Sequence, residues 1–175
     1  MTEADDSIVS LQPNKSEVDP RPPWLIKFQA PETSVRTIEI DGTPYPYTIV
    51  KSGLAEGLPY AVGYPAEHAL FVSEDCPPAY IPYVLAHEVR EKVAYAHLSE
   101  EERCPAALRE ELADVAVQHP EMAEEYTIER LAFFEALVTL YQIPKQRETK
   151  TPAFLRGIEN SRDFLTALVA PLESA

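Results

Sequence analysis

The chain has 175 residues, which is enough for one domain with a sizeable core and too few for two full domains. Its net charge of -14 argues against a partner held through phosphate contacts, such as nucleic acid or an anionic membrane surface. Two cysteines do not make a disulfide framework, and no apolar run approaches the roughly 20 residues of a membrane span. The acidic, polar start does not resemble a signal peptide, so we expect a soluble cytoplasmic protein.

The first 23 residues are acidic, polar and proline-bearing, without a clear period of apolar positions. This composition predicts a disordered or loosely packed arm over residues 1–23 and a single domain over residues 24–175. Order is expected to begin at WLIKFQA, residues 24–30, a short apolar run with strand composition.

Residues 34–52 predict a β-hairpin, because apolar and polar residues alternate on both sides of Asp41-Gly42, a turn dipeptide. Pro44 and Pro46 in the return strand indicate an edge position or a strand that starts after Pro46. Residues 58–65 are a further extended candidate, and HALFVS, residues 68–73, is a better one.

The second half of the chain changes to helical periodicity, with helices predicted over residues 78–99, 99–118, 121–142 and 151–172. Ser99 should cap the second helix, and Gly157 suggests a break in the last one. Strands followed by helices indicate an α+β fold, in which a short N-terminal sheet of a hairpin and an edge strand packs on about four helices.

The stretch LAHEVREKVAY, residues 85–95, places three ionisable side chains on the apolar side of its helix. His87 and Glu91 are four residues apart and project from one face, one turn apart, while Glu88 falls in a sector expected to be largely buried. Two buried carboxylates near each other are unfavourable unless a cation joins them. A divalent metal is the simplest such cation, and His with carboxylate suits zinc, manganese or iron.

The segment ALFVSEDCPPAYIPYVLAHEVREKVA, residues 69–94, resembles the core of the zincin metallopeptidases. In that family a strand precedes a helix with the motif HExxH, whose histidines bind zinc and whose Glu activates a water. Here the motif is HExxE, with Glu91 in place of the second His. The resemblance implies a zincin-like fold, His87 and Glu91 as metal ligands, and Glu88 as the catalytic base of a peptide hydrolase.

In the gluzincin branch of the family, a Glu on a later helix is the third ligand. Glu129 is the candidate for that role, because Met122, Phe133 and Leu140 flank it on the helix and should bury it in part. The resemblance thus implies a zinc or other divalent cofactor held by His87, Glu91 and Glu129, and a peptide or protein substrate.

Four other interpretations remain open. The acidic residues could be ordinary helix charges, with Glu88 paired to Lys92 one turn later and Glu129 paired to a basic neighbour. The chain could then be a non-catalytic interaction or regulatory domain without metal. Alternatively, Cys76 near a helix start could form a nucleophilic pair with a His. A structural zinc site could use two Cys and two His, namely Cys76, His87, Cys104 and His119.

Overall fold

The structure is a computed structural model that describes residues 35–50, 57–64 and 70–172. The predicted arm over residues 1–23 and the predicted strand WLIKFQA lie outside the described residues. Within them the fold class is α+β, as the sequence predicts, with four strands and five α-helices.

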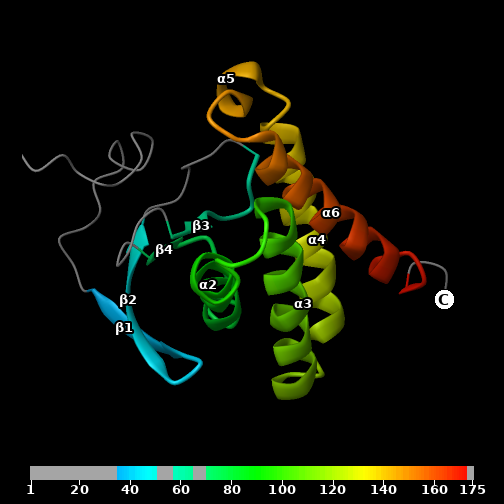
Figure 1. The fold of residues 1–175 in the computed structure, drawn as a ribbon. Coiled ribbons are helices and arrows are strands. Elements are labelled where there is room, and N and C mark those ends of the chain that lie inside the picture. The colour runs from blue at the N-terminus through cyan, green and yellow to red at the C-terminus, as the bar shows by residue number, and fades with distance from the viewer. Residues whose placement is uncertain (1–34, 51–56, 65–69, 173–175) are drawn as a thin grey trace, which may run out of the picture.

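A four-stranded mixed sheet forms one side of the molecule (Figure 1). Its strands are β1 (Arg36–Ile40), β2 (Thr43–Val50), β3 (Val62–Gly63) and β4 (Leu70–Ser73), in the order β1-β2-β4-β3. β2 and β4 are parallel, whereas the two outer pairs are antiparallel. The predicted hairpin is therefore confirmed, and β3 and β4 lie within the two other segments expected to be extended. The expectation that the strand over residues 68–73 lies at the edge of the sheet is wrong, because β4 pairs with β2 on one side and β3 on the other.

The hairpin turn consists of Asp41 and Gly42, with Ile40 opposite Thr43. Both turn residues have positive φ, 50° for Asp41 and 76° for Gly42. Two successive left-handed residues are what a tight hairpin turn requires, and Asp and Gly are among the residues that tolerate this conformation best.

The strand register explains how β2 accommodates Pro44 and Pro46. β2 is an inner strand, but its pairing with β4 begins only at Tyr47. Pro44 and Pro46 pair with β1 alone, at positions that alternate with the hydrogen-bonded pairs flanking the turn. Their missing N–H groups consequently interrupt no ladder, because no described strand lies on that side.

The helices are α2 (Ile81–Val89), the π-helical segment η1 (Arg90–Ala94), α3 (Glu100–Gln118), α4 (Ala123–Leu140), α5 (Pro144–Arg147) and α6 (Pro152–Val169). Figure 1 shows α2 between the sheet and the group of α3, α4 and α6. The centre of α2 is thus enclosed on both sides, and Val84 and Leu85 are fully buried. No helix among the described residues is both long and apolar enough to cross a bilayer.

The expected break near Gly157 is wrong, because α6 runs without interruption from Pro152 to Val169. Gly157 has a different role. A Cβ atom at this position would lie 3.1 Å from the carbonyl oxygen of Glu100 and 3.4 Å from the Cα of Glu101. The glycine therefore lets α6 approach the first turn of α3 closely.

Candidate metal centre

His87 lies in the last turn of α2, and Glu91 follows in the π-helical segment η1. The wider turn is marked by the bond from Tyr95 N to Arg90 O, a spacing of five residues at 2.8 Å. Such π-turns inside α-helices often occur at functional sites. The pair His87 and Glu91 meets as the spacing predicts, with Nε2 and Oε2 3.6 Å apart.

A third donor comes from α3. The Sγ atom of Cys104 lies 3.6 Å from His87 Nε2, so the thiol and the Glu91 carboxylate approach the same ring nitrogen. Donor atoms of His87, Glu91 and Cys104 all lie within 4.8 Å of one another, and all three residues are buried. Among the described residues, no other group of three His, Cys, Asp or Glu side chains converges in this way.

These separations suit a tetrahedral zinc-class ion. Bonds of about 2.0 Å to nitrogen and 2.3 Å to sulfur place neighbouring ligands about 3.3–3.7 Å apart at tetrahedral angles. The two distances measured from His87 Nε2, to Glu91 and to Cys104, are both 3.6 Å. The third separation, of Glu91 from Cys104, is no more than 4.8 Å.

Glu111 on α3 lies behind the imidazole of His87. Its Oε2 atom is 2.7 Å from Nδ1, an ion-pair contact, although Nδ1 is not directed at the oxygen with hydrogen-bond geometry. Contact at Nδ1 leaves Nε2 for Glu91 and Cys104. A carboxylate on the far nitrogen of a histidine is the usual companion of a metal-binding imidazole, because it fixes the tautomer and ring orientation.

Glu111 is itself held by two residues of α4. Arg130 approaches it with Nε at 2.7 Å and Nη2 at 3.2 Å, and the hydroxyl of Tyr126 donates to Oε1. Arg130 also donates from Nη1 to the hydroxyl of Tyr60 at 2.9 Å. The four side chains are each no more than 3% exposed, so this network lies in the interior.

Burial of these side chains and their contacts with one another shift the pKa values of His87, Glu111 and Cys104. Burial alone would lower the pKa of His87, but contacts with Cys104, Glu111 and Glu91 raise it well above its ordinary value. Burial would raise the pKa of Glu111, yet Arg130 and His87 hold it below the usual range. Burial raises the pKa of the Cys104 thiol, and His87 opposes that rise. Burial is the larger influence, so Cys104 stays a thiol in the metal-free protein.

Glu88 is partly exposed and is not a member of the donor group. Its pKa is raised by burial among protein atoms and by the charge of Glu91. The alternative pairing of Glu88 with Lys92 is not what the structure shows, since Lys92 Nζ lies 3.6 Å from Glu91 Oε1. Glu88 thus has no ion pair with another described residue.

Glu129 is half-buried, as its helical neighbours predict, but it does not join the donor group. Its carboxylate lies beside the hydroxyl of Tyr80, and burial together with that carboxylate raises the pKa of Tyr80 to about 12. Of the four residues in the Cys and His alternative, His87 and Cys104 meet. His119 is exposed and contacts Glu121 at 3.0 Å, and Cys76 is buried outside the donor group.

His87 contacts Cys104 on one side and Glu111 on the other, as the base of a cysteine hydrolase contacts its nucleophile and its orienting acid. Two features disfavour that interpretation. Cys104 is only 3% exposed, so no substrate reaches its sulfur. Burial also raises the pKa of the Cys104 thiol, which disfavours the thiolate that would act as the nucleophile.

The sequence interpretation misses Glu111 as the partner of His87, and it places Cys104 only in the alternative site of two Cys and two His, not beside Glu91. A signal for Glu111 exists, because it occupies the buried stripe of α3 between Leu108 and Val115. A carboxylate on an apolar stripe predicts a buried partner. Arg130 gives the same signal on α4, between Tyr126 and Phe133 or Phe134.

No protein-family model, no curated protein and no solved structure matches this chain. The arrangement of side chains is accordingly the sole basis for a functional assignment.

Proposed function

We propose that this chain binds a divalent metal ion, most suitably zinc, through His87, Glu91 and Cys104. The observation that carries the proposal is the convergence of three buried donor atoms of different chemistry within 4.8 Å. Imidazole nitrogen, carboxylate oxygen and thiolate sulfur are the three ligand types that zinc accepts. Softer sulfur at Cys104 disfavours magnesium and calcium, which prefer oxygen ligands.

The buried charges are balanced in the metal-free protein, in which protonated His87 and Arg130 face Glu91 and Glu111, and they stay balanced when a metal binds. With a dication bound, His87 is neutral and Cys104 is a thiolate. The ion and Arg130 then carry three positive charges against three negative charges on Glu91, Glu111 and the thiolate. Burial of charge is tolerable only when it is compensated in this way.

The HExxE helix beside a β-strand supports a zincin-like arrangement, and metal-dependent peptide hydrolysis is the second candidate function. A metal ion held there would supply Lewis-acid chemistry. The specific observation in favour of hydrolysis is Glu88, which is partly exposed, lacks an ion pair with a described residue and has a raised pKa. Such a carboxylate is a stronger base than an ordinary Glu, which favours the abstraction of a proton from an attacking water.

Burial of the ligands favours a structural ion over a catalytic one. His87 is 2% exposed, Glu91 8% and Cys104 3%. Catalytic zinc keeps a coordination position open to water and substrate, whereas structural zinc is closed. Metal binding is therefore the main conclusion, and hydrolysis requires that substrate approach from the side of Glu88.

The metal content of tag-free protein purified without chelator, measured by elemental mass spectrometry, tests the proposal. Wild type should carry about one ion per chain, and His87→Ala and Cys104→Ala should each lose it. Cys76→Ala is the matched control, because it removes a buried thiol outside the donor group and should keep the metal.

Absence of metal from wild type, even after incubation with zinc, manganese and iron, would reject the proposal and favour an interaction domain without metal. For hydrolysis, Glu88→Gln should retain the ion and lose any peptidase activity found in wild type. Equal activity in wild type and Glu88→Gln would exclude the role of base.

A further inference from the structure

The hydroxyl of Ser161 on α6 contacts the sulfur of Cys104, one of the three donors of the candidate metal centre. Its Oγ atom lies 3.3 Å from Cys104 Sγ. Ser161 is 0% exposed, so its hydroxyl depends on partners within the protein. A buried hydroxyl beside a ligand atom is in a position to influence how that atom binds an ion.

The close packing of α6 on α3 brings these two side chains together. Gly157 lies one turn before Ser161, and Glu100 lies one turn before Cys104. The absence of a side chain at Gly157 lets the two helices approach at the first of these turns, where a Cβ atom would lie 3.1 Å from the carbonyl oxygen of Glu100. One turn further along both helices, the hydroxyl meets the sulfur.

The hydroxyl of Ser161 has two acceptors within reach and a single hydrogen to donate. Besides Cys104 Sγ, the carbonyl oxygen of Gly157 lies 2.9 Å from Ser161 Oγ. No other described residue forms a hydrogen bond with this hydroxyl. A bond to the carbonyl four residues earlier is a frequent local pattern of serine in helices. The carbonyl and the sulfur therefore compete for one hydrogen.

The ionisation state of Cys104 decides this competition. In the metal-free protein Cys104 is a thiol, whose sulfur is a weak acceptor, so the carbonyl of Gly157 is preferred. A cysteine that binds a metal ion is a thiolate. Hydrogen bonds to an ionised acceptor are roughly twice as strong as those between neutral groups. The metal-bound form therefore favours donation from Ser161 to Cys104.

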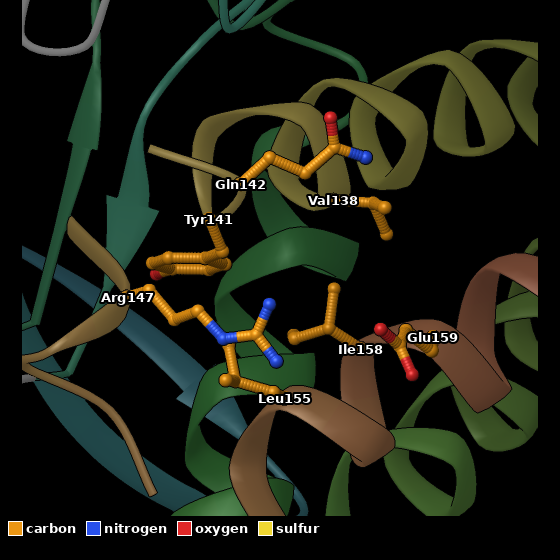
Figure 2. Close-up of a pocket in the computed structure, with 7 residues that line it drawn as sticks. All are labelled: Val138, Tyr141, Gln142, Arg147, Leu155, Ile158 and Glu159. Carbon is orange, nitrogen blue, oxygen red and sulfur yellow. The ribbon is translucent and has the colours of Figure 1, made fainter. Parts of the chain in front are cut away.

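The pocket where the end of α4, the short helix α5 and the first turns of α6 meet does not reach this hydroxyl (Figure 2). The α6 residues that line it are Leu155, Ile158 and Glu159. Neither Ser161 nor Cys104 lines this pocket, which measures about 140 Å³. A molecule in the pocket would therefore not compete with Cys104 for the hydroxyl.

We propose that Ser161 is a positioning residue of the metal centre, which donates a hydrogen bond to the Cys104 thiolate when an ion is bound. This inference rests on the proposed function, because it requires an ion at His87, Glu91 and Cys104. Partners of this kind orient the ligand, and their loss typically costs about 10- to 100-fold in metal affinity. The bond also stabilises the electrons of the sulfur, which suits an ion that is retained in a closed site.

Substitution of cobalt(II) for zinc tests the inference, because a thiolate bound to cobalt gives a sulfur-to-metal charge-transfer absorption band. A hydrogen bond to the sulfur lowers the energy of its lone pairs and raises the energy of that transition. Ser161→Ala should therefore bind Co²⁺ about tenfold more weakly than wild type, and its band should shift to longer wavelength. A role confined to helix packing would not shift the band. The variant adds no atom and alanine favours helices, so it should fold.

Thr166→Ala is the matched control. Thr166 also lies on α6, and its hydroxyl donates to the carbonyl of Arg162, four residues earlier, at 2.9 Å. It is exposed and does not contact Cys104, so this variant should keep the wild-type affinity and band. Ser161→Thr keeps a hydroxyl at the tested position and should keep the wild-type band.

The outcomes separate this inference from the proposed function. Cobalt binding by wild type with an unchanged band and affinity in Ser161→Ala would overturn the inference and leave the metal site intact. A Ser161→Thr band displaced as far as that of Ser161→Ala would also overturn it, because the hydroxyl would then not be the cause. Failure of wild type to bind either Co²⁺ or Zn²⁺ would overturn both the inference and the proposed function.

Discussion

The Nδ1 atom of His87 lies 2.7 Å from Oε2 of Glu111, which is fully buried and belongs to the next helix. This contact determines which nitrogen of the imidazole faces Glu91 and Cys104. It also joins the candidate metal centre to the buried network around Arg130. A change at Glu111 should consequently affect both metal binding and stability.

Replacement of Glu111 by Gln keeps the side-chain shape and removes the charge. We expect metal affinity to fall about 10- to 100-fold, because the far nitrogen of His87 loses its carboxylate partner. We also expect the free energy of unfolding to fall by about 3–5 kcal/mol, since Arg130 would remain buried without a counter-charge. Competition with a chelator measures the first effect, and urea unfolding of the metal-free protein measures the second.

Glu124→Gln provides the control, because Glu124 is an exposed acidic residue in the first turn of α4. Its effect on stability should stay within about 0.5 kcal/mol. If Glu111→Gln unfolded at the same urea concentration as Glu124→Gln, the buried ion pair would not contribute to stability as argued.

Removal of metal should destabilise the protein through mass action. When free ion is present at about 100 times its Kd, binding adds about 2.7 kcal/mol to the unfolding free energy. Thermal melts with and without chelator should therefore differ for wild type and for Cys76→Ala. His87→Ala and Cys104→Ala should melt at the same temperature in both conditions, and a chelator effect of wild-type size in either variant would contradict the ligand assignment.

Gly157→Ala should destabilise the packing of α6 on α3. Alanine improves helix propensity by about 1 kcal/mol, but overpacking commonly costs about 1–3 kcal/mol. The new Cβ would meet the backbone of Glu100 at 3.1 Å, and backbone atoms cannot move aside as a flexible side chain can. We expect a lower midpoint of urea unfolding, whereas Asn160→Ala, at an exposed position of the same helix, should not lower it. A Gly157→Ala variant more stable than wild type would show that the helices can separate at little cost.

Asp41 should give a pH-dependent contribution to stability. Arg90 donates to both of its carboxylate oxygens, at 3.0 and 2.8 Å, and holds the pKa of Asp41 below its ordinary value of 3.8. The ionised form is therefore favoured in the folded state. Its contribution is complete well above pH 3.8 and is lost as the pH falls through the lowered folded-state pKa.

Asp41→Asn is the appropriate variant, because Asn also tolerates the positive φ of this turn. The difference in unfolding free energy between wild type and Asp41→Asn should be constant from neutral pH to about pH 5 and should shrink below pH 3.8. Denaturant unfolding at several pH values measures it. A difference that grows on acidification would contradict the sign of the pKa shift.

Local chemistry explains which parts of the fold were predictable. The Asp41-Gly42 turn depends on two residues that favour positive φ, and the pairing of His87 with Glu91 depends on helical spacing alone. Gly157 led to the wrong prediction of a helix break, because a glycine weakens an isolated helix. In the folded protein the same glycine permits close contact between α6 and the backbone of Glu100. That contact exists only once α3 and α6 pack together.

The remaining parts of the site depend on tertiary packing. Cys104 reaches His87 across 17 residues of sequence, and no spacing rule connects them. Glu129 was a reasonable third ligand by analogy, but its helix presents Arg130 to the interior instead. The choice among many glutamates could not be made without knowing which face of α4 meets α2 and α3.

The bond between Arg130 and Tyr60 spans 70 residues of the chain. The sheet, α2 and α3 all emerge from the ribosome before Arg130 does. Until then the hydroxyl of Tyr60 and the carboxylate of Glu111 lack the guanidinium that compensates them in the finished core. The N-terminal half of this protein therefore completes its packing only after α4 has been synthesised, so nascent chains that stop before Arg130 should remain accessible to chaperones and proteases.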